Sequence, residues 1–335
     1  MPEKYSYFWK HVDPAFPLTY VDVGAMGGIA RKWDSVRSKM RIIAFEPDDR
    51  EFVKLKSDPQ LTYLNVALFS QSQDLKFYVT KESGKSSVYR PNMEIVSQYP
   101  NSERFRVMQE RIIPAAKVKN LDAVIQEQDI SEIDFIKIDT QGSELDILSG
   151  GLSALADNFG VELEVEFLSL YEGQPLFRDV DKFMETQGFE LMDLRRAYWK
   201  RKDYFSFVGK GQLIFGDALY FKRPDALKKM LAGIPKEQQC SRIYKYILIC
   251  LIYRLFDYAT MIARIAKEEQ KISDKEFQEI LSQIKKESWR GMVPNFPGRN
   301  FVHQRIVYPL VQSIRSMSYL GWADGDYGIG NAEDL

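Results

Sequence analysis

The sequence predicts an α/β protein with a mostly parallel sheet that is covered on both faces. Apolar, strand-like segments alternate with helix-like segments between residues 19 and 223. The first apolar segment runs into the small residues of Asp22 to Gly28, and the second ends on Glu46. In open α/β sheets this combination is typical of a nucleotide pocket, because glycine lets the backbone approach a ligand and a carboxylate accepts hydrogen bonds from ribose hydroxyls.

The individual elements follow from periodicity and from turn residues. Strands are predicted at residues 20–24, 42–46, 61–68, 134–139, 161–167, 189–194 and 217–222. Helices are predicted between them at residues 48–56, 120–127, 143–155 and 179–187. Residues 74–80 and 111–118 alternate like half-exposed strands, which predicts an insertion at about residues 70–118 near the mouth of the pocket.

The chain divides into an N-terminal arm (1–18), a main domain (19–223) and a helical C-terminal extension (224–335). Ser273 to Glu276 form a capping box that opens a helix through Lys286, and the tail from Gly321 is expected to be flexible. Charged residues interrupt the apolar stretch 243–266, whereas a membrane-spanning helix needs about 20 predominantly apolar residues. This stretch is therefore predicted to be a buried core helix or a homo-oligomer contact.

The composition of the chain limits the kinds of partner that it is expected to bind. The chain has 46 Lys and Arg against 47 Asp and Glu, so its net charge does not attract nucleic acid or an anionic membrane, and no nucleic-acid partner is expected. Two cysteines are too few for a disulfide framework and lack zinc spacing. The N-terminus shows no basic region followed by an apolar run, which predicts a cytoplasmic protein.

Five motifs occur in order between about residues 19 and 222. They are Asp-Val-Gly-Ala-x-x-Gly (22–28), Phe-Glu-Pro (45–47), Asn-Val-Ala-Leu (65–68), Phe-Ile-Lys-Ile-Asp-Thr-Gln-Gly-Ser-Glu-Leu-Asp-Ile-Leu (135–148) and Gly-Asp-Ala-Leu-Tyr (216–220). This order resembles the FkbM-type S-adenosylmethionine-dependent methyltransferases. The Lys-Ile-Asp-Thr-Gln-Gly-x-Glu block is the specific element, and the chain departs from the family at Met26, where members often carry Asn.

The resemblance implies a Rossmann-like sheet of seven strands with a reversed final strand. It also implies S-adenosylmethionine as cofactor, and methyl transfer to a hydroxyl of a sugar, glycolipid or other small molecule. Asp22 would anchor the methionine end and Glu46 would hold the ribose. The remaining implied cofactor residues are those of the glycine-rich turn (Gly24, Ala25 and Gly28) and those of the adenine site (Asn65 and Ala67).

Two acids are candidates for catalysis. Asp139 ends an apolar strand, and Glu144 stands in the first turn of the next helix, so both can face one crevice. A carboxylate there could take the proton of the acceptor hydroxyl, or bind a divalent metal that acidifies it, although the sequence offers no support for a metal. Lys137 needs a partner for its charge, and Glu162, Glu164 and Glu166 share one side of a strand, with Glu166 nearest its end.

Two other functions stay open from the residues alone. An NAD(P)-dependent oxidoreductase on a similar sheet would need partners for hydride transfer such as a Tyr-x-x-x-Lys pair, and neither Tyr89 nor Tyr220 has a Lys at that spacing. A non-catalytic scaffold would use the C-terminal helices as its functional surface. Nothing diagnostic identifies the methyl acceptor.

Overall fold

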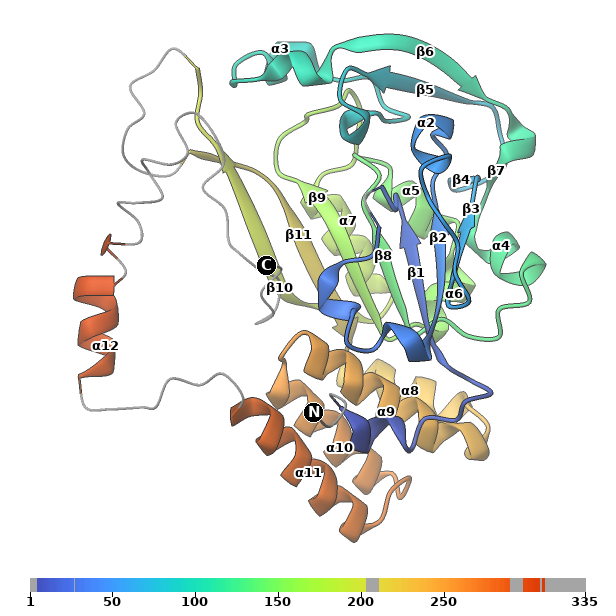
Figure 1. The fold of residues 1–335 in the computed structure, drawn as a ribbon, viewed down its shortest axis with the longest axis vertical. Coiled ribbons are helices and arrows are strands. Elements are labelled where there is room, and N and C mark those ends of the chain that lie inside the picture. Colours follow the sequence, from blue (N-terminus) through green and yellow to red (C-terminus); the bar gives the residue numbers. More distant parts are fainter. Residues whose placement is uncertain (1–4, 27, 203–210, 290–297, 308, 311–335) are drawn as a thin grey trace.

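The computed structural model describes residues 5–26, 28–202, 211–289, 298–307 and 309–310, and a seven-stranded sheet forms its centre (Figure 1). The strand order is β10-β11-β9-β8-β1-β2-β3. The strands are β1 (Leu18–Val23), β2 (Met40–Phe45), β3 (Leu61–Leu64), β8 (Phe135–Ile138), β9 (Gly160–Glu166), β10 (Phe189–Trp199) and β11 (Gln212–Lys222). Only β11 runs antiparallel to its neighbours among these pairings, which confirms the reversed final strand.

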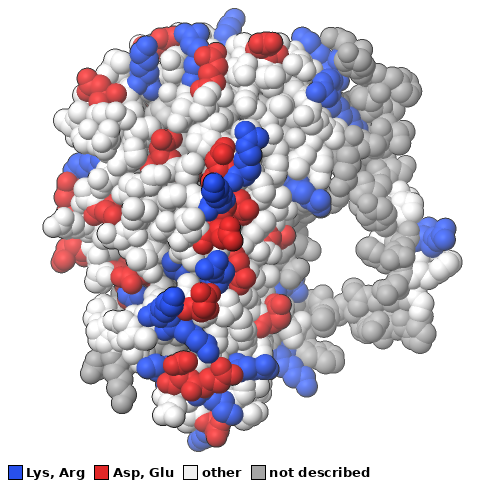
Figure 2. Space-filling view, turned by 180° about the vertical axis from the view of Figure 1, so that it is seen from behind, with Lys and Arg blue, Asp and Glu red and all other residues white. Residues whose placement is uncertain are grey.

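One face of the sheet is covered by the helices that connect its strands. These are α4 (Leu121–Glu127), α5 (Glu144–Ser149), α6 (Leu152–Asp157) and α7 (Phe177–Thr186). Their apolar sides and the inward side chains of the sheet form one core cluster, to which Val21, Ile43 and Ile136 belong. On the outer surface seen from behind, basic and acidic side chains are interspersed (Figure 2).

The opposite face is covered by segments from the two ends of the chain. In the described residues 28–39, between β1 and β2, there are two 3₁₀ turns, and β2 leads to β3 through the single turn α2 (Asp49–Phe52). The helices α8 (Pro224–Gly233), α9 (Lys236–Ile252), α10 (Phe256–Glu268) and α11 (Asp274–Trp289) contribute to the core of this face together with α1 (Ser6–Trp9). Residues of α9 and of the sheet stack directly, with 4.6 Å between the ring centres of Tyr246 and Phe159.

The core helix predicted at 243–266 is divided by a turn at residues 253–255 between α9 and α10, and the part in α9 is buried as predicted. Residues 243–251 are almost completely inaccessible to solvent. The buried cations of α9 are neutralised at the start of β8, where Arg242 binds Glu132 at 2.6 Å and Lys245 binds both Glu132 and Asp134. No helix in the described part of the chain is long and apolar enough to cross a membrane.

The predicted insertion is also present. Strands β5 (Leu75–Thr80) and β6 (Val107–Ile113) form an antiparallel ribbon, and α3 (Met93–Val96) follows β5. The ribbon lies at the upper edge of the sheet in Figure 1, opposite the C-terminal helices. The predicted strand 111–118 is displaced toward the N-terminus, because Pro114 lacks the N–H that would continue the ladder.

Three predicted elements are shorter than expected. The helix predicted at 48–56 is reduced to α2, whose Asp48 cap is in place but whose apolar side chains are only half-buried. The strand at 61–68 divides at Asn65, and its second part, β4 (Ala67–Leu68), pairs with β7 (Val118–Lys119). The helix at 143–155 breaks at Gly150, where a Cβ atom would lie 2.6 Å from the Phe69 carbonyl oxygen.

At the C-terminus, the capping box predicted at Ser273 is confirmed: the Glu276 amide donates to the Ser273 hydroxyl, and Glu276 accepts from the Ser273 amide at 2.7 Å. The helix that it opens, α11, ends at Trp289 rather than Lys286. The short helix α12 (Arg299–Val302) follows. The tail from residue 321 lies outside the described residues.

Candidate functional site

A cavity of about 320 Å³ lies at the carboxyl ends of β1, β2 and β8. In open α/β sheets this edge is where ligands bind, and the volume is at the lower end of the range for small-molecule pockets. Residues from the β1–β2 turn, the β3–β4 segment, the β8–α5 loop and the insertion line it together. Four of the nine predicted site residues line the cavity directly: Gly24, Glu46, Ala67 and Asp139.

The glycine-rich turn is packed against the end of β8. Gly24 has a φ of +82°, and a Cβ atom at this position would lie 1.9 Å from the carbonyl oxygen of Asp139, so only glycine fits. The amides of Gly24 and Ala25 donate to the Phe45 carbonyl at 3.1 and 3.2 Å, which ties the turn to β2. Ala25 is buried beneath the turn, and Gly28 stands away from the cavity with open space around it.

Asp22 lies below the cavity rather than in its wall. Both of its carboxylate oxygens are buried, and neither accepts a hydrogen bond from the described part of the chain. The Lys137 ammonium lies 3.7 Å from Asp22 and 3.9 Å from Asp139, which supplies the partner that its charge needs. Burial raises the pKa of Asp22 to about 6. Burial lowers the pKa of Lys137, but Asp22 and Asp139 outweigh this effect and raise it above its ordinary value.

Glu46 lies at the end of β2 and faces the cavity. Its Oε1 accepts a hydrogen bond from the Asp48 amide at 2.8 Å, and burial raises its pKa to about 7. Asn65 does not line the cavity: its amide donates to the Glu46 carbonyl at 3.1 Å and its Oδ1 accepts from Lys117. Beyond Ala67 the wall is apolar, with Leu68, Phe77, Val88 and Ile113.

Asp139 lies on the opposite side of Gly24 from Glu46. Its amide donates to the Val23 carbonyl at 2.9 Å, which fixes the end of β8 against β1. Burial raises the pKa of Asp139, but the ammonium groups of Lys137 and Lys85 and hydrogen bonds from Gln141 and Glu164 outweigh it, so the net direction is downward. The side chain is therefore an ionised carboxylate at neutral pH.

Glu144 points back into its own loop instead of into the cavity. Its Oε1 accepts from the amide and the hydroxyl of Thr140 at 2.7 and 2.9 Å, and its Oε2 accepts from the Gly142 amide at 3.0 Å. Burial raises its pKa to about 7. These bonds hold the loop that carries Asp139, so Asp139 and Glu144 belong to one structural unit although only Asp139 reaches the cavity.

Sequence reasoning missed Gln141 and Lys85, and did not select Glu164, although all three line the cavity. Gln141 has a left-handed φ of +60°, and its amide nitrogen donates to Asp139 at 3.1 Å and also to Glu164. Glu162, Glu164 and Glu166 share one side of β9 as predicted, but Glu166, which the sequence suggests could reach the site because it is nearest the strand end, does not line the cavity, whereas Glu164 does. Glu162 instead pairs with Lys32 at 2.9 Å.

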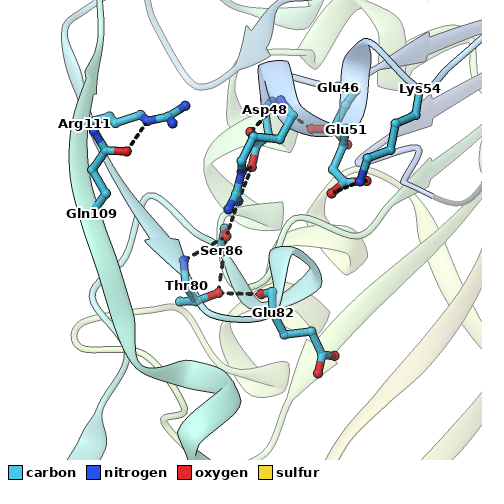
Figure 3. A network of polar contacts seen from close by, with 10 residues as sticks. Glu46, Asp48, Glu51, Lys54, Thr80, Glu82, Ser86, Gln109 and Arg111 are labelled. Atoms are coloured by element: carbon cyan, nitrogen blue, oxygen red, sulfur yellow. Dashed lines mark hydrogen bonds and ion pairs between the residues drawn. The ribbon is translucent and has the colours of Figure 1, made fainter.

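Residues 82–86 of the insertion pass over the cavity. Arg50 binds Asp48 and reaches the Ser86 hydroxyl at 3.4 Å. Figure 3 shows the next contact, in which Ser86 accepts a hydrogen bond from the Thr80 amide at 3.1 Å. On the other side Lys85 donates to Gln141 Oε1 at 3.1 Å. Met26, where family members often carry Asn, lies beside this segment, so a Cβ atom at Gly84 would be 2.7 Å from the Met26 methyl group.

The cavity thus has Glu46 and an apolar wall on one side of the Gly24 turn, and Asp139 with Glu164 on the other side. The turn itself leaves no room for a side chain at Gly24. Such a set can accept hydrogen bonds from ribose hydroxyls, bury a purine ring and accept a proton. No group of three or more His, Cys, Asp or Glu residues that could hold a metal ion occurs within the described ranges.

The chain is similar to several known proteins. A curated relative, described as 2-O-methyltransferase NoeI from Sinorhizobium fredii, is 23% identical over 177 residues, which cover 51% of this chain and 72% of that protein. A solved S-adenosylmethionine-dependent methyltransferase from Anabaena variabilis is 10% identical, with coverage of 65% and 81% and a TM-score of 0.32. A precorrin-6y C5,15-methyltransferase from Geobacter metallireducens is 13% identical, with coverage of 65% and 88% and a TM-score of 0.29.

The decisive finding is a family model. The model described as the methyltransferase FkbM domain matches residues 22–191, which is just over half of the 335 residues. This match includes the glycine-rich turn, the Glu46 strand end and the complete Asp139 block. The chain therefore belongs to the FkbM family of S-adenosylmethionine-dependent methyltransferases.

Proposed function

We propose that this protein is an O-methyltransferase that acts on a hydroxyl of a carbohydrate, glycolipid or other small molecule. The observation that carries the proposal is the placement of Glu46 and Asp139 in one cavity, on either side of the Gly24 turn. One carboxylate is thereby available to the ribose of a cofactor, while the other is available to the acceptor. The relative described as a 2-O-methyltransferase supports oxygen as the methylated atom.

The cavity fits S-adenosylmethionine on structural grounds. Glu46 would accept hydrogen bonds from the ribose hydroxyls, and the apolar wall beyond Ala67 would enclose the adenine. Asn65 would act indirectly, by holding the Glu46 main chain. Gly24, Ala25 and Gly28 would shape the turn around the methionine end. Asp22 would support the methionine end from beneath the turn, where its buried carboxylate lies 3.7 Å from the Lys137 ammonium.

When bound, the cofactor supplies an electrophilic methyl group on a positively charged sulfur. The protein must then place the acceptor oxygen in line with that group and remove the hydroxyl proton. Asp139 is the proposed catalytic carboxylate because its side chain lies in the cavity wall. Glu144 would position Asp139, since its hydrogen bonds fix residues 140–142 of the same loop.

The proposal is tested by calorimetry and by methyl transfer. S-adenosylmethionine should bind to the purified chain and NAD should not. Methyl transfer from labelled cofactor to oligosaccharides or to a host-cell extract, followed by mass spectrometry, should give a product heavier by one methyl group on oxygen. Asp139→Asn should lower the rate by about 10–150-fold, the usual value of a hydrogen bond to a charged group. Glu127→Gln, on the remote and exposed end of α4, should leave the rate unchanged.

Tight binding of NAD without binding of S-adenosylmethionine would contradict the proposal. A methylated nitrogen or carbon in the product would contradict the oxygen specificity alone. Unchanged transfer by Asp139→Asn would remove Asp139 from the chemistry while leaving the cofactor assignment intact.

A further inference from the structure

We propose that Glu164 is a second catalytic carboxylate, which takes the proton of the acceptor hydroxyl while Asp139 stays ionised beside it. This inference rests on the proposed function, because it concerns the same cavity and the same transfer. Its basis is a pair of acids on neighbouring strands that share one amide group.

The sheet register places the two acids side by side. Ile138 of β8 is opposite Leu163 of β9, so the next position along each strand brings Asp139 next to Glu164. Both side chains line the cavity, and Glu164 is 7% exposed. Glu166, two positions further along β9, does not line the cavity.

The Gln141 amide joins the two carboxyl groups. Its Nε2 donates to Asp139 Oδ1 at 3.1 Å and to Glu164 Oε2. Its Oε1 accepts from Lys85 Nζ at 3.1 Å and from the Tyr171 hydroxyl at 3.0 Å. Lysine can only donate, so the carbonyl end of Gln141 must face Lys85 and the NH₂ end must face the acids. The left-handed backbone of Gln141 is thus used to hold both carboxyl groups at once.

The environments of the two acids differ. Asp139 has the Lys137 ammonium at 3.9 Å, whereas the groups around Glu164 are mainly acidic. Burial raises the pKa of Glu164 well above its ordinary value, and Asp139 adds to this effect. Several charged and titratable groups face Glu164: Asp139 on the β8–α5 loop, Glu144 on α5, Lys85 on the insertion, Glu166 on β9, and Tyr171. Asp217 on β11 is paired with Glu164 in the sheet and binds Arg195.

Two carboxyl groups this close favour holding one proton between them. Of two carboxylates, the one with the higher pKa is the stronger base and therefore the better proton acceptor. Glu164 therefore suits the role of base, and Asp139 suits that of an ionised acceptor of a hydrogen bond from the hydroxyl. Positive charge on the bound sulfur stabilises ionised Glu164, so cofactor binding should release its proton before transfer.

A lone pair of the hydroxyl oxygen forms the new O–CH₃ bond while the S–CH₃ bond breaks and its electron pair stays on sulfur. The hydroxyl proton passes to a carboxylate oxygen of Glu164. The products are the methyl ether, a neutral thioether and protonated Glu164, which loses its proton to water before the next cycle.

The first test measures protons rather than turnover. Titration of the full chain with S-adenosylmethionine near pH 7, in two buffers with different ionisation enthalpies, should show proton release from the wild type. S-adenosylhomocysteine, which lacks the charge on sulfur, should release less. Glu164→Gln should bind the cofactor within about threefold of wild type but release no proton. The matched control Glu166→Gln, on the same strand and equally buried, should keep the release.

The second test measures the reaction. Glu164→Gln should lower kcat by about 10²–10⁴-fold and remove the acidic limb of the pH profile, which Glu166→Gln should retain. Formate should partly restore kcat of Glu164→Ala, which a merely structural role would not allow. Proton release and an acidic limb that persist in Glu164→Gln would overturn the inference. Failure of the wild type to bind S-adenosylmethionine or to transfer a methyl group would instead refute the proposed function itself.

Discussion

Glu46→Gln should make the folded protein more stable at alkaline pH while it weakens cofactor binding. Glu46 is 6% exposed, and burial raises its pKa from its ordinary 4.5 to about 7. At about 1.36 kcal/mol per pH unit, keeping this carboxylate ionised in the folded state costs roughly 3 kcal/mol. The amide of Gln avoids that cost, and its Oε1 can keep the hydrogen bond from the Asp48 amide.

The pH window follows from the direction of the shift. A pKa that is higher in the folded than in the unfolded chain means that the folded state binds the proton more tightly. The favourable contribution of Glu46 is then fully present below about pH 4.5 and is lost as the pH rises through about 7. Wild type and Glu46→Gln should therefore differ little at pH 4.5 to 5, and the variant should be more stable by up to roughly 3 kcal/mol at pH 8.

Urea unfolding of both proteins at several pH values measures this difference. Glu51→Gln is the matched control on the neighbouring turn, because the hydrogen bond from Lys54 lowers the pKa of Glu51 instead (Figure 3). Its Lys54 partner is 63% exposed, so this variant should lose less than about 1 kcal/mol at pH 8. Parallel stability curves for wild type and Glu46→Gln would refute the reasoning. In calorimetry, loss of the hydrogen bonds from ribose to a charged group should weaken binding of S-adenosylmethionine by about 10–150-fold.

Two further predictions concern stability alone. Gly24→Ala should lose roughly 2–5 kcal/mol in urea unfolding, because its Cβ would lie 1.9 Å from a carbonyl oxygen; Gly28→Ala, with a similar φ but open space, should lose only about 1–2 kcal/mol. Arg242→Met should lose about 3–5 kcal/mol because it leaves the buried Glu132 short of a partner, whereas Arg37→Met breaks an exposed pair and should cost under about 1 kcal/mol. Equal losses within either matched pair would contradict the corresponding explanation.

The sheet could be predicted from the sequence because its central strands are nearly continuous apolar runs with abrupt ends. Residues 135–138 show this, and residues 161–165 show instead an alternation of apolar residues with glutamates; each is part of a strand of the structure. The segment after Glu46 misled the same reasoning: Phe52 and Leu55 suggest a helix face, but both are only half-buried and the helix ends at Phe52. The periodicity of a segment does not show whether its apolar side is buried in the core.

Some residues of the candidate site could likewise be predicted from the sequence and others could not. Gly24, Glu46 and Asp139 could be chosen because each stands at a strand end within a recognisable motif. The sequence favours Glu166 because it is nearest the strand end, but the register of β8 and β9 places Glu164 beside Asp139, and Glu164 lines the cavity. Lys85 is separated from Gln141 by 56 residues, so no local sequence pattern predicts their contact.

The position of the C-terminal helices has a consequence for how the chain is made. One face of the sheet is complete only when residues 224–289 pack on it, and these are synthesised after the whole of the main domain. At about 5–20 residues per second, a ribosome needs several seconds to add them. During that time apolar side chains such as Phe135, Phe159 and Phe221 lack their contacts with these helices. A chain that stops at residue 223 would remain in that state. Chaperone demand and sensitivity to premature termination should therefore peak late in translation, after the catalytic motifs have all emerged.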